Sequence, residues 1–275
     1  MTYNIDYHFH PNLPKSEKKA HKKSKKAWEN FQKHNINVVI STEHVFKNPQ
    51  RAFSVMKKNK PDDAFLFPGI EYLTQEGIDV LIFSQDEKIY THKELTPYNL
   101  SLEETVTFAK KNNYACSIAH PHTLGTTSII KRMGQEKYLQ YAQKTKSIEL
   151  SNSSFNNILP CLNFFLLKKI FAKKIKQIEN NRLVPKENFF QEINFFAVGS
   201  DAHHPDQIGT CCTLNHHAQE LYEKIINNKA PEIREKTSPK TNFVILMRDS
   251  ICVFREFLIK KYFFISYRIK CWKQL

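Results

Sequence analysis

The first fragment whose residue types could do chemistry is Asp6-Tyr7-His8-Phe9-His10, near the start of the chain. Side chains alternate between the two faces of a strand, so Asp6, His8 and His10 share one face. Two imidazoles with this spacing at a strand end can hold one metal ion. The chain has 12 histidines, however, and one such pair arises readily by chance. The metal hypothesis therefore depends on the rest of the sequence.

Five further fragments carry histidine, carboxylate or both, and each lies at or just beyond the C-terminal end of a predicted strand. They are Ser-Thr-Glu-His at 41–44, Pro-Gly-Ile-Glu at 68–71, Ala-His-Pro-His at 119–122, Ile-Glu-Leu-Ser-Asn at 148–152 and Gly-Ser-Asp-Ala-His at 199–203. Barrel enzymes place their chemistry at this end of the strands. Mixed imidazole and carboxylate ligands suit Mn, Zn or Fe. The number of ligands implies two or three divalent ions.

The order of these fragments resembles the PHP (polymerase and histidinol phosphatase) superfamily. The shared motifs are D-x-H-x-H, [DE]-H, G-x-E, A-H-P and G-S-D-A-H, and they extend over residues 3–213. The resemblance implies an α/β fold, with a distorted seven-stranded (β/α)7 TIM-like barrel. It also implies a metal-dependent phosphoesterase that hydrolyses phosphomonoesters or small phosphodiesters at a di- or trinuclear centre, where metal-activated water attacks.

The family pattern also implies which residues bind metal. Matched position by position, it gives the ligands His8, His10, Glu43, His44, Glu71, Asp79, His120, Asp201 and His203. Within this set, Glu71 would bridge two ions. The expected catalytic residues are Glu43, Asp201 and His203, of which Glu43 or His203 would handle protons.

Two positions depart from the commoner family pattern. Glu43 stands where aspartate is more usual, which shifts its carboxylate by about one carbon-carbon bond. Asp79 stands where another histidine is usual, so it either coordinates in place of that histidine or leaves the second site weaker. Asp6 and Glu149 are expected to orient the ligands, because a ligating imidazole normally donates its other N–H to a carboxylate or carbonyl.

Seven short apolar or β-branched runs predict the strands that position these residues. The strands are expected at 2–9, 37–42, 65–72, 78–84, 114–119, 147–150 and 195–199, and helices at 15–33, 51–59, 102–112, 129–145 and 159–180. The third and fourth strands are joined by too few residues for a crossover helix and should form a hairpin. The chain is expected to divide into a PHP domain at 1–230 and an extension at 231–275.

The charge of the chain favours anionic partners. Forty-one Lys and Arg residues against 27 Asp and Glu give a formal net charge of +14. A small phosphorylated substrate is expected, and nucleic acid and an acidic membrane surface stay open. Lys131 and Arg132 either meet a phosphate or form a basic helix face. The six cysteines lack the paired spacing of zinc or redox motifs, which indicates a cytoplasmic protein.

The segment 243–275 combines aromatic and basic residues. Two interpretations stay open: a C-terminal helix packed on the barrel, and an amphipathic helix at the inner membrane surface. A different function class is also considered, in which a catalytically weak PHP scaffold binds nucleic acid or acidic membrane through its basic surface. The retained ligands argue against that alternative, since a pseudoenzyme typically loses some of them.

Overall fold

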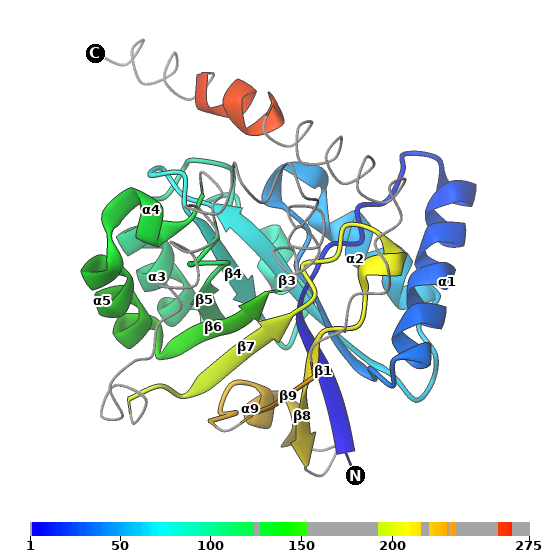
Figure 1. Ribbon diagram of the computed structural model, residues 1–275. Helices are drawn as coiled ribbons and strands as arrows, with labels where there is room; N and C mark the ends of the chain where they lie inside the picture. The colour runs from blue at the N-terminus through cyan, green and yellow to red at the C-terminus, as the bar shows by residue number, and fades with distance from the viewer. Residues whose placement is uncertain are drawn as a thin grey trace, which may run out of the picture.

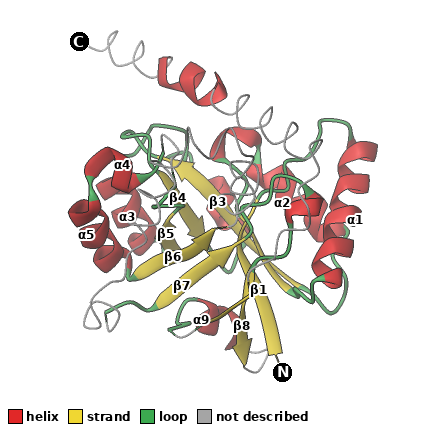
Figure 2. Cartoon of the chain, viewed as in Figure 1, coloured by secondary structure: helices red, strands yellow, loops and turns green. Residues whose placement is uncertain are grey.

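The computed structural model describes residues 2–123, 127–152, 192–215, 220–229, 231–234 and 258–265. The predicted helix at 159–180 and most of the segment 243–275 lie outside these residues. Figure 1 shows a curled sheet with helices on its outer side. Figure 2 shows that strands fill the centre of the molecule and that the longer helices lie at its periphery.

A seven-stranded mixed sheet forms the larger part of the fold, in the order β5-β4-β3-β2-β1-β8-β9. Its strands in chain order are β1 (Thr2–Phe9), β2 (Val38–Ser41), β3 (Phe65–Leu73), β4 (Asp79–Phe83), β5 (Ala115–Ile118), β8 (Cys211–Asn215) and β9 (Glu232–Arg234). β1, β2 and β3 are parallel. β3 and β4 form the expected antiparallel hairpin.

A separate parallel pair, β6 (Ser147–Asn152) and β7 (Phe195–Gly199), lies between the two sides of the curled sheet. The Ser147 hydroxyl donates to the Cys116 carbonyl of β5 at 2.6 Å. At the other side, the Asp201 N–H donates to the His8 carbonyl of β1 at 2.7 Å. All seven predicted strands are present, but β6 and β7 pair with each other outside the larger sheet, so the described residues form a half-barrel and a separate pair rather than one barrel of the seven predicted strands.

Helices cover the outer side of the sheet. They are α1 (Glu17–Lys33), α2 (Pro49–Lys58), α3 (Leu102–Lys111), α4 (Ile129–Met133), α5 (Gln135–Thr145) and α9 (Leu221–Ile225), with short 3-10 turns η1 (Val45–Lys47), η2 (Glu87–Thr91) and η3 (Pro205–Gln207). The helix predicted at 129–145 is two helices. Gly134 separates them with a φ of 87°, which lies outside the helical region and ends the first helix.

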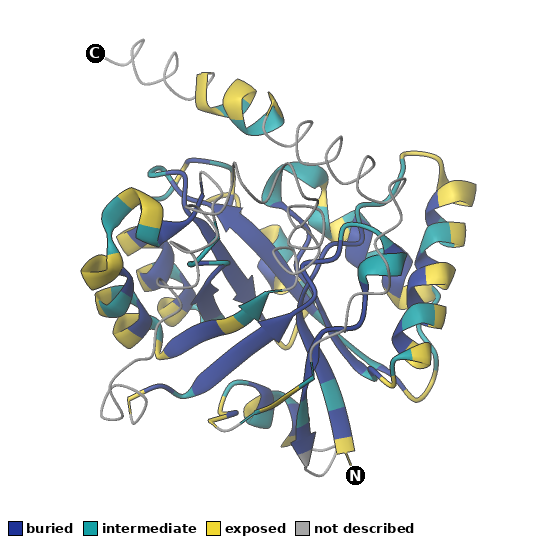
Figure 3. Ribbon diagram, in the orientation of Figure 1, coloured by how far each residue is buried: buried dark blue, intermediate teal, exposed yellow. Residues whose placement is uncertain are grey.

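The apolar pattern of α1 explains how a lysine-rich sequence becomes a packed helix. Ala20, Ala27, Trp28 and Phe31 recur at helical spacing and are buried against the sheet, while the lysines occupy the outer face. Figure 3 shows this division as a dark inner and a pale outer face. The apolar face of this basic helix therefore packs on the core, and its charged face points outward.

Among the described residues, no helix is long and apolar enough to span a membrane. The described part of the C-terminal segment, 258–265, is helical. Figure 1 draws it in red across the top of the sheet, where it contacts the core as described below.

Candidate metal centre

The end of β1 and the loop after β7 bring the first group of candidate ligands together. His8 and His10 lie on the same face of β1, and their Nε2 atoms are 3.0 Å apart. Asp201 Oδ1 lies 3.1 Å from His10 Nε2 and 3.5 Å from His8 Nε2. All three side chains are buried. Two ring nitrogens and a carboxylate oxygen therefore converge on one point inside the protein.

Glu71, at the end of β3, connects this group to the others. Its two carboxylate oxygens each lie 3.6 Å from a ring nitrogen of the first group, Oε1 from His8 Nε2 and Oε2 from His10 Nε2. Glu71 Oε2 also pairs with His44 Nδ1, and Oε1 lies 2.9 Å from His120 Nε2. Glu71 thus contacts histidines of all three groups.

The second group consists of Glu71, Asp79 and His120. Asp79 Oδ2 is 3.5 Å from His120 Nε2, so the aspartate occupies the place where the family pattern expects another histidine. Within the described part of the chain, Asp79 Oδ1 and His120 Nδ1 are buried without a hydrogen-bond partner. Buried polar atoms are normally paired, so these orphaned atoms, on the residues whose Oδ2 and Nε2 converge with Glu71, fit a group that would hold a cation.

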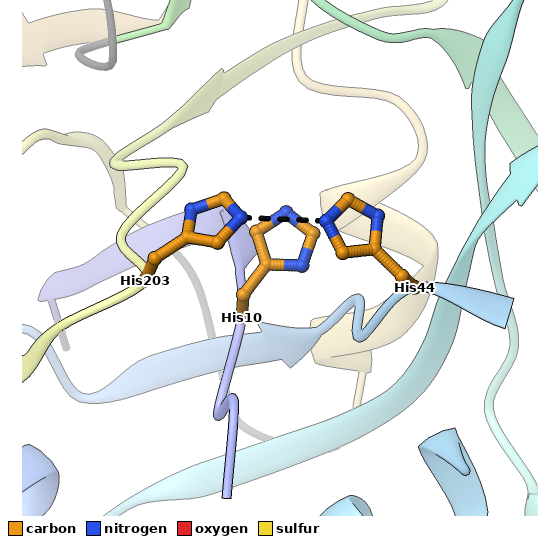
Figure 4. A group of neighbouring side chains, drawn as sticks. All are labelled: His10, His44 and His203. Atoms are coloured by element: carbon orange, nitrogen blue, oxygen red, sulfur yellow. Dashed lines mark hydrogen bonds between the residues drawn. The ribbon is translucent and has the colours of Figure 1, made fainter. Parts of the chain in front are cut away.

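The third group consists of His10, His44 and His203. Figure 4 shows the three rings side by side, with His10 between the other two. The Nε2 atoms of His44 and His203 lie 3.3 Å apart. His203 is the most accessible of the three, with 17% of its side chain exposed, so this group lies nearest to solvent.

The backbone around two of these ligands is unusual. Asp201 and His120 have φ values of 47° and 31°, in the left-handed region that non-glycine residues seldom adopt. Gly199 permits β7 to lie directly against β1, because a Cβ at this position would come within 2.6 Å of the His8 backbone nitrogen. Backbone strain at functional sites is common, and here it aims two ligands at the centre.

Buried carboxylates hold the ligating rings in place. Glu149 Oε1 lies 2.8 Å from His8 Nδ1, and its other oxygen accepts from the His120 backbone N–H. Asp6 accepts hydrogen bonds from the Ser200 backbone and from its hydroxyl. Glu149 therefore lies behind a ligating ring, in an orienting position. Among the described side chains, Asp6 contacts no ligating ring and instead accepts from the His8 backbone N–H, at 3.1 Å, so it holds the backbone around this ligand.

Glu43 also lies behind a ligand. Its Oε1 is 3.8 Å from His10 Nδ1 and accepts from the His44 N–H at 3.1 Å, while Oε2 accepts from the Asn12 N–H. Burial raises the pKa of this carboxyl, but His10, Lys47 and His44 outweigh that effect and lower it to about 2. The structure does not bring Glu43 into any of the three groups, unlike the other eight predicted ligands.

The charges of the centre are set by burial and by mutual contact. Burial lowers the pKa of His8, but the carboxylates of Asp201, Glu149 and Glu71 together outweigh burial and raise this pKa to about 9. His10 shows the opposite balance, since burial and the neighbouring His44 and His203 lower its pKa. Burial raises the pKa of Glu71, yet His44 and His120 hold it well below its usual range. The Glu71 carboxylate is thus ionised, as a ligand must be.

This donor set fits divalent ions of the borderline class. Imidazole nitrogens with carboxylate oxygens suit Zn, Mn or Fe better than Mg or Ca. The first and third groups share His10. Glu71 of the second group contacts His8, His10 and His44, so the three groups adjoin one another as in a multinuclear centre.

Comparisons with known proteins rest on structure. No protein family's sequence profile and no curated protein matches the chain. The crystal structure of PsfC from Pseudomonas syringae PB-5123 is similar, with a TM-score of 0.55 and 14% identity over 94% of this chain and 99% of that chain. The lesion-specific endonuclease EndoQ from Pyrococcus furiosus has a TM-score of 0.50 and 15% identity, covering 85% of this chain and 58% of its own.

A third structure is Endonuclease Q in complex with a 27-mer duplex substrate that carries an abasic lesion at the active site. It has a TM-score of 0.52 and 15% identity, and covers 82% of this chain and 56% of its own. The fold is PHP-like. At these identities the similarity concerns the fold alone, and the chain spans somewhat more than half the length of the endonuclease chains.

Two lysines beside the three ligand groups were not expected from the sequence. Lys260 Nζ, from the helix 258–265, lies 2.6 Å from Asp79 Oδ2. Lys23 of α1 donates to the carbonyl oxygens of Asn12 and His203, at 2.8 and 3.0 Å. Lys260 and Asp79 are 181 residues apart in the chain. No local sequence pattern predicts such a contact, and only the fold reveals it.

Proposed function

We propose that this protein is a metal-dependent phosphoesterase that hydrolyses phosphomonoesters or small phosphodiesters. The observation that carries the proposal is the convergence of the His8 and His10 Nε2 atoms with Asp201 Oδ1, all buried and within 3.5 Å of one another. Buried histidines and carboxylates at such density have no structural advantage, since each loses hydration on burial. A scaffold of the distorted seven-stranded barrel type would present them at its open end.

The proposed ligands fall into three sites around Glu71. The sites are His8, His10, Glu71 and Asp201; Glu71, Asp79 and His120; and His44 with His203, beside His10. Glu43 is proposed to hold His10 in its ligating orientation. Two or three ions of Mn, Zn or Fe would fill these sites.

Bound divalent ions would lower the pKa of a coordinated water and offset charge on the phosphoryl oxygens. The chain's own residues would then orient the ester and move protons. His203 would either complete the third site or carry a proton, because its ring is partly exposed and the contact of its Nδ1 with the Asp201 carbonyl at 3.0 Å leaves Nε2 for one of these two roles. Asp201 would support both the ligand set and the orientation of His203, with Asp201 Oδ1 3.7 Å from His203 Nδ1.

Nucleic acid is a candidate substrate or partner as well as small phosphoesters. The similar Endonuclease Q is described with a DNA duplex at its active site, and this chain carries a formal net charge of +14. Electrostatic attraction to phosphate backbones follows from that charge. The alternative function, a catalytically weak scaffold that binds nucleic acid or acidic membrane in the cytoplasm, would use the same charge without hydrolysis.

A substrate screen tests the proposal. The purified protein, loaded separately with Mn, Zn, Fe or Mg, is assayed on phosphomonoesters, short phosphodiesters and DNA carrying an abasic site. We expect turnover with at least one borderline metal, and loss of that turnover in His120→Ala. Binding to DNA or acidic vesicles without hydrolysis of any ester would favour the scaffold alternative.

A further inference from the structure

The helix 258–265 lies against the proposed metal centre. Its Lys260 ammonium contacts Asp79 at 2.6 Å, and the Lys260 carbonyl accepts from the Tyr98 hydroxyl at 3.2 Å. The Phe264 ring packs edge-on against Tyr98, with centroids 5.7 Å apart. Contacts of three kinds, ionic, hydrogen-bonded and aromatic, thus fix this helix on the core beside the second ligand group.

A further aromatic chain reaches the third ligand group. Phe263 lies against Phe46 at a centroid distance of 6.2 Å, and Phe46 stacks on the His44 ring at 4.8 Å with an interplanar angle of 12°. The same short helix therefore touches the surroundings of two ligand groups, through Lys260 at one and through Phe263 at the other.

A pocket of about 230 Å³ opens where the helix meets α4 and the turn between β3 and β4. Arg132, Lys260 and Lys261 contribute three cationic groups to its lining, and Tyr98 and Phe264 contribute rings. The Arg132 guanidinium lies over Gly77, where a Cβ would come within 2.9 Å of its Nη2 atom. A side chain at 77 would displace the guanidinium, so this glycine helps to shape the pocket.

The charge balance of the pocket favours an anion. Glu76 is the acidic residue in its lining, and one Glu76 oxygen already accepts from the Leu102 N–H at 2.8 Å. The Lys260 ammonium is paired with the Asp79 carboxylate. A divalent ion bound by Asp79 would take over that carboxylate, and the Lys260 ammonium would then favour a new anionic partner.

We infer that this pocket binds a second phosphate group of a ligand whose first phosphate lies at the metal centre. Lys260 stands at the junction of the two sites, and Arg132 and Lys261 face the second phosphate. The inference rests on the proposed function and specifies its substrate class: a phosphoester with another phosphate nearby. A small bisphosphorylated molecule and a nucleic acid strand both have that chemistry, and the rings of Tyr98 and Phe264 suit a flat group between the phosphates.

Binding of non-hydrolysable compounds tests the pocket without turnover. Phenylphosphonate, 1,4-phenylenebisphosphonate and a thymidine trinucleotide with non-hydrolysable methylenephosphonate linkages are titrated calorimetrically into the full-length, metal-loaded protein. The variants are Arg132→Met and Lys261→Met, and the matched control is Lys25→Met, an exposed lysine of α1, which lies at the opposite side of the molecule from α4 in Figure 1. Metal content and circular dichroism are recorded for each preparation.

The wild-type protein should bind the bisphosphonate or the trinucleotide roughly tenfold more tightly than phenylphosphonate, as expected for one charge-assisted contact. Arg132→Met and Lys261→Met should each remove most of that preference, and Lys25→Met should keep it. The tighter of the two ligands identifies the source of the second phosphate. An unchanged preference in both pocket variants, or no preference in the wild type, would overturn the inference.

Hydrolysis of phenyl phosphate by the same preparations separates this inference from the proposed function. If the protein hydrolyses phenyl phosphate but binds ligands with a second phosphate no more tightly, the pocket inference is wrong and the proposed phosphoesterase function stands. If the protein prefers ligands with a second phosphate, this preference depends on Arg132, and no ester is hydrolysed, the proposed phosphoesterase function is wrong and the pocket is a binding site.

Discussion

Glu43 can act in two ways beside a metal centre, and its contacts favour one of them. Both of its oxygens accept backbone N–H groups, and Oε1 lies 3.8 Å from His10 Nδ1. A pKa near 2 makes it a poor proton acceptor at neutral pH and a good permanent counter-charge. We therefore expect Glu43 to orient His10 rather than to move protons.

The variant Glu43→Gln tests this assignment. Loss of a supporting carboxylate typically weakens metal affinity or activity by about 10- to 100-fold, so metal affinity should fall by that amount while the fold is kept. Metal titration and thermal melting check it. Full metal affinity together with a turnover loss of roughly 10² or more would instead make Glu43 the acid-base group.

The protonation of His8 predicts a pH dependence of metal binding. With a pKa of about 9, His8 is cationic at neutral pH in the metal-free protein, whereas a histidine that coordinates a metal must be neutral. Metal binding should therefore release a proton, and metal affinity should rise with pH up to about 9. Calorimetry in two buffers of different ionisation enthalpy measures the proton, and release of none at pH 7 would contradict the prediction.

The same group affects the stability of the metal-free protein in the opposite direction. A histidine whose folded pKa is raised stabilises the fold fully below its unfolded value near 6.5, and that contribution is lost as the pH rises through about 9. The metal-free protein should thus lose stability over this pH window, whereas the metal-loaded protein gains it.

At the scale of elements, the approach of β7 to β1 sets the geometry of the first group. Gly199→Ala would push a methyl group against His8, which should cost roughly 1–3 kcal/mol and reduce metal content by displacing the strand. Gly134→Ala is the matched control, because nothing lies within 4 Å of its Cβ. Its left-handed φ should lower stability modestly without loss of metal. Equal metal content in both variants would contradict the role given to Gly199.

Much of this arrangement could be predicted because strand patterns and strand-end motifs are local in sequence. The expected strands from 2–9 to 195–199 are all present, and eight of the nine predicted ligands meet in three groups. The short strands β8 and β9 were not predicted. Their pairing with β1 and with each other stabilises runs that are too short or too polar to be recognised alone.

Other features could not be predicted because they depend on tertiary contacts. The break at Gly134 was missed because the helical pattern continues on both sides of it. Glu43 sits beside His44 in sequence, yet the turn directs its carboxylate behind His10. Lys260 is one of many lysines in the chain, and only the docking of its helix distinguishes it.

At the scale of the whole molecule, negative and positive charge are separated. The acidic groups of the described core gather inside, around Glu71, Asp79, Asp201 and Glu149, where they face histidines. In the described part of the chain, lysines gather on outer helix faces such as that of α1. Such an arrangement draws anions toward a centre whose own carboxylates require cations.

Metal content is the most direct measure of the central claim, that the buried histidines and carboxylates bind divalent ions. Elemental analysis should find two to three equivalents of Mn, Zn or Fe in the wild-type protein, and a loss of at least one equivalent in Asp201→Ala. The exposed carboxylate variant Asp62→Ala should keep the full content, and circular dichroism establishes that all three proteins are folded. A folded wild-type protein that binds none of these metals, or an Asp201→Ala protein with undiminished metal, would contradict the account.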